Sequence, residues 1–151
     1  MKSTVKEILD VKGSDVATVN SDETVFDALV KMSKKDVGAL VVLKNDKLAG
    51  IFSERDYARK IVLHGKSSKE SIVGEMMSSE ISVIHPDTSI EECMTLMTKK
   101  HIRHLPVLEG EKLAGIISIG DVVSRIINDQ ETTIKNLEDY IYGKPIANNP
   151  L

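Results

Sequence analysis

The chain has 151 residues, of which 41% are hydrophobic and 3% aromatic, and its formal net charge at pH 7 is −3. Basic residues are scattered rather than clustered, which argues against nucleic acid as a partner. No apolar run approaches the roughly 18 residues that span a bilayer, and the N-terminus shows no signal peptide, so we expect no membrane segment. The one cysteine, Cys93, cannot form an internal disulfide, which favours a cytoplasmic location.

The predicted elements begin with a short helical turn at Lys6–Leu9, a segment that resembles Gly74–Met77 and is expected to pack beside its copy. A short strand follows at 16–19, because apolar and polar residues alternate there. Ser21-Asp22 then offers a helix start, and apolar residues recur at helical spacing over 25–32.

Two strand-like runs at 39–43 and 48–52 flank a polar turn at 44–47, which predicts a hairpin. Helical spacing returns after Asp56. The polar stretch 63–68 that follows is expected to be a linker.

The sequence then repeats the same pattern at an offset of 65 residues. When 22–56 is aligned with 87–121 without gaps, 14 of the 35 positions are identical. The phrase LAGIFSERD at 48–56 returns as LAGIISIGD at 113–121. An internal repeat of this quality predicts that each copy is one supersecondary unit, β-α-β-β-α.

The second copy therefore predicts a strand at 81–84 and a helix start at Pro86-Asp87. A unit of about 55 residues buries little surface alone, so we expect an α/β (α+β) fold in which the two copies pack as one pseudo-two-fold domain with a shared core. Ile134, Leu137 and Ile141 then form an amphipathic stripe. The expected divisions are 1–66 for the first repeat with the N-terminal segment, 67–128 for the second, 129–143 for a C-terminal helix and 144–151 for a tail.

The repeated phrase carries a candidate site. Ser53 and Ser118 each follow a strand and precede a helix, and Asp56 or Asp121 stands three residues later. The first amides of a helix attract anions such as phosphate, and a carboxylate accepts hydrogen bonds from vicinal ribose hydroxyls. Ser-x-x-Asp is also nearly a capping box, which by itself stabilises a helix. The repeat does not decide between these two interpretations.

The motif Gly-apolar-apolar-Ser-x-x-Asp, written twice in a tandem β-α-β-β-α repeat, resembles the cystathionine β-synthase (CBS) domain pair, or Bateman module, over roughly residues 5–128. The resemblance implies a non-catalytic regulatory module that binds AMP, ADP, ATP, NAD or S-adenosylmethionine between the repeats and senses energy or metabolite state. It also implies that the chain forms a homodimer and regulates a protein partner that is not identified. No cofactor is expected beyond the adenosine ligand. The alternative is a structural or dimerisation module with degenerate sites.

By this resemblance, Asp56 and Asp121 bind ribose hydroxyls. The residues expected to face phosphate or ribose are Ser53, Ser118, Arg55, His101, Arg103 and His104. The residues expected to form the adenine pocket are Thr18, Val19, Val37, Gly38, Ala39, Ser82, Val83, Ile102, Leu105 and Pro106. The first copy has no cations where the second has those of 101–104, although Arg55 could substitute, so we expect two unequal sites, with phosphate held more tightly around Asp121. Because the family's cleft opens between the copies, Arg103 could serve either site.

His101 and His104 do not predict a metal site, because residues three apart on a strand point to opposite faces. No nucleophile, base and orienting group stand together in the sequence, so we expect no catalytic residue and no enzyme. Cys93 aligns with Ala28 on a helix, which favours a small buried residue over a reactive thiol.

Overall fold

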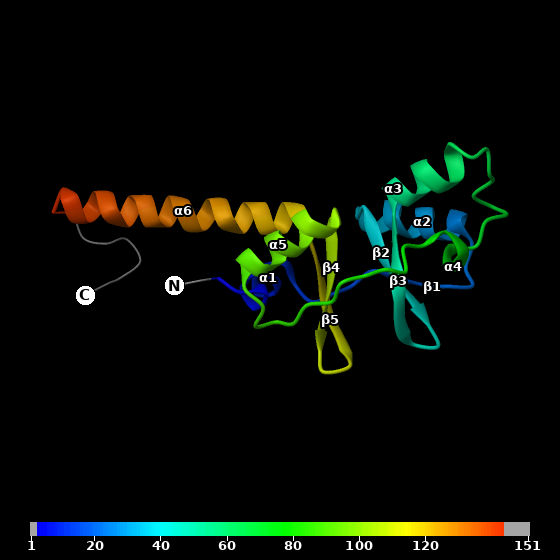
Figure 1. The fold of residues 1–151 in the computed structure, drawn as a ribbon, viewed down its shortest axis with the longest axis horizontal. Coiled ribbons are helices and arrows are strands. Elements are labelled where there is room, and N and C mark those ends of the chain that lie inside the picture. The colour runs from blue at the N-terminus through cyan, green and yellow to red at the C-terminus, as the bar shows by residue number, and fades with distance from the viewer. Residues whose placement is uncertain (1–2, 144–151) are drawn as a thin grey trace.

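The computed structural model describes residues 3–143 (Figure 1). The first repeat contains β1 (Thr18–Asn20), α2 (Val25–Lys35), β2 (Ala39–Lys44), β3 (Lys47–Ser53), α3 (Glu54–Asp56) and the π-helix η1 (Tyr57–Val62). β1 pairs parallel with β2, and β2 pairs antiparallel with β3. The predicted hairpin is confirmed, and α3 follows its second strand directly.

The second repeat contains α5 (Ile90–Lys100), β4 (His104–Glu109), β5 (Lys112–Ser118) and α6 (Ile119–Ile141). β4 and β5 form an antiparallel hairpin like that of the first repeat. The sequence predicted a separate helix over 129–143, but α6 runs without a break from Ile119 to Ile141. The expected tail, 144–151, lies outside the described residues.

The predicted strand at 81–84 is wrong, because it is reduced to one parallel bridge between Ile84 and β4. In the first repeat the amide of Val41 donates a hydrogen bond of 3.0 Å to the carbonyl of Ala17, which extends the pairing. Pro106 occupies the equivalent position in β4 and has no amide hydrogen. The same bond cannot form, so the strand is lost.

The two predicted helix starts are also wrong, by three residues each. Ser21-Asp22 lies in a turn, and α2 begins after Thr24, whose hydroxyl accepts a 3.1 Å hydrogen bond from the amide of Asp27. In the second repeat Ser89 caps α5 in the same way, with a 3.1 Å bond from the amide of Glu92. Side-chain oxygens at these positions satisfy amides that the first helical turn leaves unpaired.

The core is divided into two clusters of buried apolar residues, one for each repeat, rather than the single shared core that we expected. The first cluster includes Val73 of α4 (Val73–Met76), and the second includes Val5 and Ile8 of α1 (Val5–Lys12). α1 directly precedes the first repeat in sequence but completes the core of the second. α4 directly precedes the helix α5 of the second repeat but completes the core of the first. α1 lies beside β5 and α6, and α4 lies beside β3 and α2 (Figure 1). The expectation that Lys6–Leu9 packs with its own copy is wrong.

Within residues 3–143, no helix combines the length and the apolar character that crossing a membrane requires.

Candidate functional site

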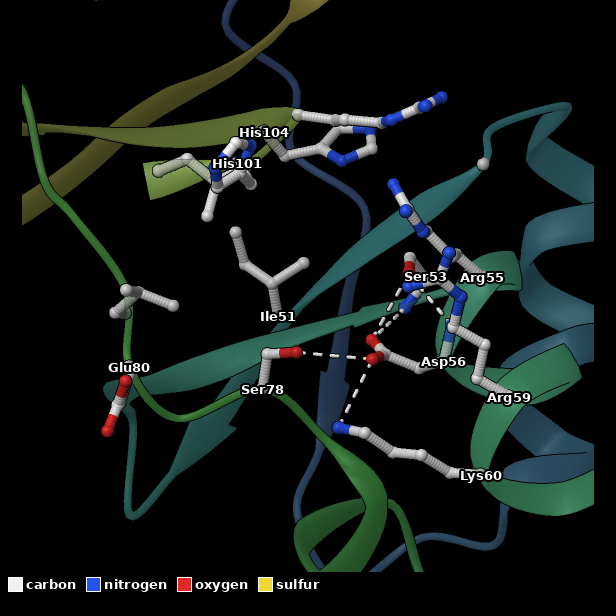
Figure 2. A pocket seen from close by; sticks show the side chains of 14 residues that line it. Ile51, Ser53, Arg55, Asp56, Arg59, Lys60, Ser78, Glu80, His101 and His104 are labelled. Atoms are coloured by element: carbon white, nitrogen blue, oxygen red, sulfur yellow. Dashed lines mark hydrogen bonds and ion pairs between the residues drawn. The ribbon is translucent and has the colours of Figure 1, made fainter. Parts of the chain in front are cut away.

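A cleft of about 470 Å³ lies where the two repeats meet. Its walls come from β3, α3 and η1, from the segment that leads into the second repeat, and from the corner between α5 and β4 (Figure 2). The predicted site residues that line it are Gly38, Ser53, Arg55, Asp56, His101, Ile102, Arg103 and His104. The structure thus brings the Ser-x-x-Asp motif of the first repeat together with the cationic segment 101–104 of the second.

Asp56 lies at one end of this cleft, with its side chain only 12% exposed. Its Oδ2 accepts hydrogen bonds from the amide and the hydroxyl of Ser53, at 3.0 and 3.1 Å. Its Oδ1 accepts from the hydroxyl of Ser78 at 3.1 Å and lies 3.2 Å from Nζ of Lys60. The carboxylate therefore has four protein donors, close to what its lone pairs can accept.

The capping interpretation of the motif is confirmed in both repeats. The hydroxyl of Ser53 accepts a hydrogen bond from the amide of Asp56 while the carboxylate of Asp56 reaches back to the amide of Ser53. Ser118 and Asp121 make the same reciprocal pair at the start of α6. Each box stabilises the first turn of its helix by about 1 kcal/mol. Capping holds Asp56 at the cleft, and it leaves a second role for that residue open.

Positive charge dominates the cleft. Arg55, Arg59, Lys60 and Arg103 line it, and the carboxylates among the lining residues are Asp56 and Glu80. Within residues 3–143, an ion pair is recorded for Lys60 but for none of the three arginines. Their guanidinium groups are therefore available to an anion, in a protein whose net charge is negative.

The helical segment around Asp56 supplies three of these four cations, Arg55, Arg59 and Lys60. Arg55 and Arg59 are four residues apart, and η1 carries both Arg59 and Lys60. Nζ of Lys60 also donates to the carbonyl oxygens of Met76 and Met77, at 3.0 and 3.4 Å. Those contacts tie η1 to the segment from α4 that forms another wall of the cleft.

His101 and His104 face the same cleft, across from Asp56 (Figure 2). His101 is not on a strand, because it ends α5 in the left-handed conformation with φ of 54°. The argument that the two rings point to opposite faces of a strand is therefore wrong. The pKa of His104 is lowered, mainly by burial and further by the nearby cations of Lys12 and Arg103. The carboxylates of Asp121 and Asp56 offset this only in part. Among residues 3–143, no three metal-binding side chains gather at one place.

The structure places Asp121 and Ser118 outside the lining of this cleft. Oδ2 of Asp121 accepts a 2.7 Å hydrogen bond from Nζ of Lys12 and a 2.8 Å bond from the amide of Ser118. Burial raises the pKa of Asp121, but these donors outweigh it and hold the pKa below its usual value. The expectation of tighter phosphate binding around Asp121 assumed that 101–104 belongs to that site, whereas these residues line the cleft of Asp56.

Of the expected adenine pocket, Gly38 and Ile102 line the cleft. Those outside its lining are Thr18, Val19, Val37, Ala39, Ser82, Val83, Leu105 and Pro106. Val19 and Leu105 are core residues of their own repeats, and Val37 lines a neighbouring pocket beside α2. Alignment with the family's strand positions could not show which of these side chains point inward to a core.

The sequence-based prediction missed lining residues from three places: Ile51, Arg59, Lys60, Ser78, Glu80 and Ile81. Arg59 and Lys60 could have been found, because each stands four residues after Arg55 or Asp56 and so lies on the same helix face. Ser78, Glu80 and Ile81 lie between α4 and α5, in a stretch of the second repeat that carries no ligand-binding motif.

The CBS-domain family model matches residues 5–63 and 73–128. The chain therefore belongs to the CBS-domain family and carries two such domains in tandem. A solved CBS-domain protein of Burkholderia ambifaria is 47% identical, with a TM-score of 0.80, over 85% of this chain and 96% of that one. The mitochondrial CBS domain-containing protein CBSX3 of Arabidopsis thaliana is 38% identical over 93% of this chain and 73% of its own. The hexameric CBS-CP12 protein of bloom-forming cyanobacteria is 26% identical, with a TM-score of 0.76, over 93% of this chain and 87% of that one.

Proposed function

We propose that this chain is a non-catalytic regulatory module that binds an adenosine phosphate, AMP, ADP, ATP or NAD, in the cleft between its two CBS domains. The observation that carries the proposal is the excess of positive charge in that cleft, where four Lys or Arg side chains face two carboxylates. The three arginines among them are exposed, and a cleft lined mainly by charge of one sign raises the local concentration of an anion such as a phosphate. The same charge disfavours S-adenosylmethionine, whose sulfonium is a cation.

The other lining residues fit the remaining parts of such a ligand. Ile51, Ile81 and Ile102 give the cleft apolar surface on which a purine ring can lie. Asp56 is suited to the ribose hydroxyls. Because its carboxylate already has four donors, a ribose would replace Ser78 or Lys60 rather than add a fifth bond. Lys60 would then be released toward the phosphate.

Regulation follows from the position of the cleft. A ligand there contacts both CBS domains, so its binding free energy depends on how they are placed relative to each other. Binding would favour one relative placement, and a partner protein would recognise it. We also propose self-association, as in the hexameric cyanobacterial relative. We expect no turnover of the nucleotide, and the cytoplasmic location stays a prediction, since the Arabidopsis relative is named as mitochondrial.

The test is a calorimetric titration of the full chain with AMP, ADP, ATP, NAD and S-adenosylmethionine. Asp56→Asn and Asp121→Asn are a matched pair, because both remove the acid of a capping box and only Asp56 lines the cleft. Asp56→Asn is expected to weaken binding about tenfold, the loss of roughly one charged hydrogen bond, and Asp121→Asn by less than about twofold. Equal losses would show that capping, not ligand contact, is the role of Asp56.

A second pair of variants tests the phosphate contacts. Arg103→Gln removes a cleft charge, whereas Lys47→Gln removes an equal charge at the hairpin turn of the first repeat. We expect Arg103→Gln to weaken ATP more than AMP, and Lys47→Gln to leave both unchanged. If no adenosine phosphate binds the wild-type chain more tightly than about 1 mM, the nucleotide proposal fails and the structural or dimerisation module is favoured.

A further inference from the structure

The second half of α6 presents an apolar stripe that the fold of one chain does not use. Figure 1 shows this helix extending well beyond α1 and α5. Its contacts to the body include Arg125 with Glu7 at 2.7 Å and Asp129 with Ser3 at 2.6 Å, both near the middle of the helix. The helix then continues for another three turns to Ile141.

Apolar residues along α6 follow a heptad. Val123, Ile127, Ile134, Leu137 and Ile141 are 40%, 48%, 56%, 57% and 71% exposed. With Gln130 included, successive residues of this set are alternately four and three positions apart. Ile127, Ile134 and Ile141 therefore occupy a positions of the heptad, and Val123, Gln130 and Leu137 occupy d positions. We call these six residues the α6 seam. Isoleucine at a positions combined with leucine at a d position is typical of two parallel strands.

The seam does not compete with the core of its own repeat. Val122 is buried and Ile126 packs against the core cluster, so they mark the face of α6 that contacts the body. At about 100° per residue the seam lies roughly a quarter turn around the helix from that face. A second helix can therefore lie along the seam while the body stays in place.

We propose that the seam is covered by the same seam of a second copy of this chain, in a parallel, in-register, two-stranded coiled coil. In that pairing Gln130 meets its own counterpart, and an amide can both donate to and accept from its twin. An antiparallel pairing would place Gln130 against Ile134. It would also bring the e-position carboxylates of Glu131 and Glu138 along the same edge of the pair, where like charges repel.

The surface serves the self-association proposed above, and its test uses no nucleotide, so nucleotide binding stands or fails separately. The full chain is measured by sedimentation equilibrium, with circular dichroism to confirm retained helix. The double variant Ile134→Glu, Leu137→Glu places charge in the seam. Thr132→Glu, Lys135→Glu is the control, because both positions lie outside the a and d positions and are exposed.

The seam variant is expected to have half the mass of the control variant and of the wild type. Equal masses for both variants would overturn the proposal, whether the chain is monomeric or pairs by another surface. Direction is tested by Ile141→Cys under mild oxidation. Parallel strands place two such residues opposite each other and give a disulfide dimer, whereas antiparallel strands separate them by about 27 Å. Thr132→Cys, outside the seam, is expected to give none. Absence of the Ile141→Cys dimer would overturn the parallel arrangement.

Discussion

Replacing Gly50 by alanine is expected to destabilise the fold far more than replacing Gly115, although the two occupy the same position in the repeated phrase. A Cβ at Gly50 would lie 2.6 Å from the carbonyl oxygen of Ser78 and 2.8 Å from Sδ of Met77. A Cβ at Gly115 would lie 2.6 and 3.2 Å from the two methyl groups of Leu9. A leucine terminus can rotate away, whereas a backbone carbonyl moves only with its chain.

The magnitude follows from what must move. Ser78 and Ile51 exchange two backbone hydrogen bonds, of 2.9 and 3.0 Å, which hold the connection against β3. Losing both costs about 1–3 kcal/mol, and overpacking adds about 1–3 kcal/mol. Alanine returns up to about 1 kcal/mol by restricting the unfolded chain. The net loss for Gly50→Ala is about 3 kcal/mol, within a range of about 1–6 kcal/mol, against about 1 kcal/mol or less for Gly115→Ala.

The assay is urea unfolding of both variants and the wild type, followed by far-UV circular dichroism because the chain has no tryptophan. The midpoint and slope give the free energy of unfolding. Gly50→Ala is also expected to weaken nucleotide binding, since Ser78 lines the cleft. A Gly115→Ala variant as unstable as Gly50→Ala would refute the reasoning, because the identity of the clashing atom would then be irrelevant.

Three further predictions concern titrating groups. Burial raises the pKa of Cys93 to about 11, so a thiol reagent at pH 8 is expected to leave the native chain unlabelled and to react on unfolding; labelling of native protein would contradict this. The pKa of Asp121 is lowered in the folded chain. Its charged form therefore stabilises the fold at pH values above the ordinary carboxyl pKa, and this stabilisation is lost as the pH falls through the lowered pKa. Melting temperatures from pH 7 to 3 should therefore fall less steeply for Asp121→Asn, and parallel curves would count against the Lys12 contact. The lowered pKa of His104 means that unfolded chains bind its proton first as pH drops below about 6.5, so His104→Gln is expected to lose less stability than wild type between pH 7 and 5, as measured by urea midpoints.

Secondary-structure elements could be predicted where the local sequence pattern favoured a single structure. The hairpins follow from apolar runs around a polar turn, and both formed, each with a register shift near the turn. The helix starts were wrong because Ser21-Asp22 and Thr24 are all good capping residues, and only the turn geometry selects Thr24. The strand at 81–84 was lost to a residue on another strand, Pro106, which local alternation cannot reveal. Nothing in the sequence distinguished the π-helix η1 from an ordinary α-helix.

The sequence named several residues of the cleft, but it could not decide which of the two sites the segment 101–104 serves. Ser53, Asp56 and the segment 101–104 were all named, and all line one cleft. The repeat alignment, however, assigns 101–104 to the same copy as Asp121. An alignment of repeats gives equivalent positions within each copy and carries no information on which copy faces which. Contact between Asp56 and that segment is set by how the two halves dock.

α1 packs against the second repeat and α4 against the first, and this arrangement affects the order in which the chain can fold during synthesis. The first repeat lacks Val73 until α4 has emerged, by which time the polar linker has already been made. α1 is made before the other described elements, yet its place against β5 and α6 does not exist until these later elements have been synthesised. The N-terminal helix must therefore wait, with Val5 and Ile8 uncovered, and its docking becomes a late step that closes the second core.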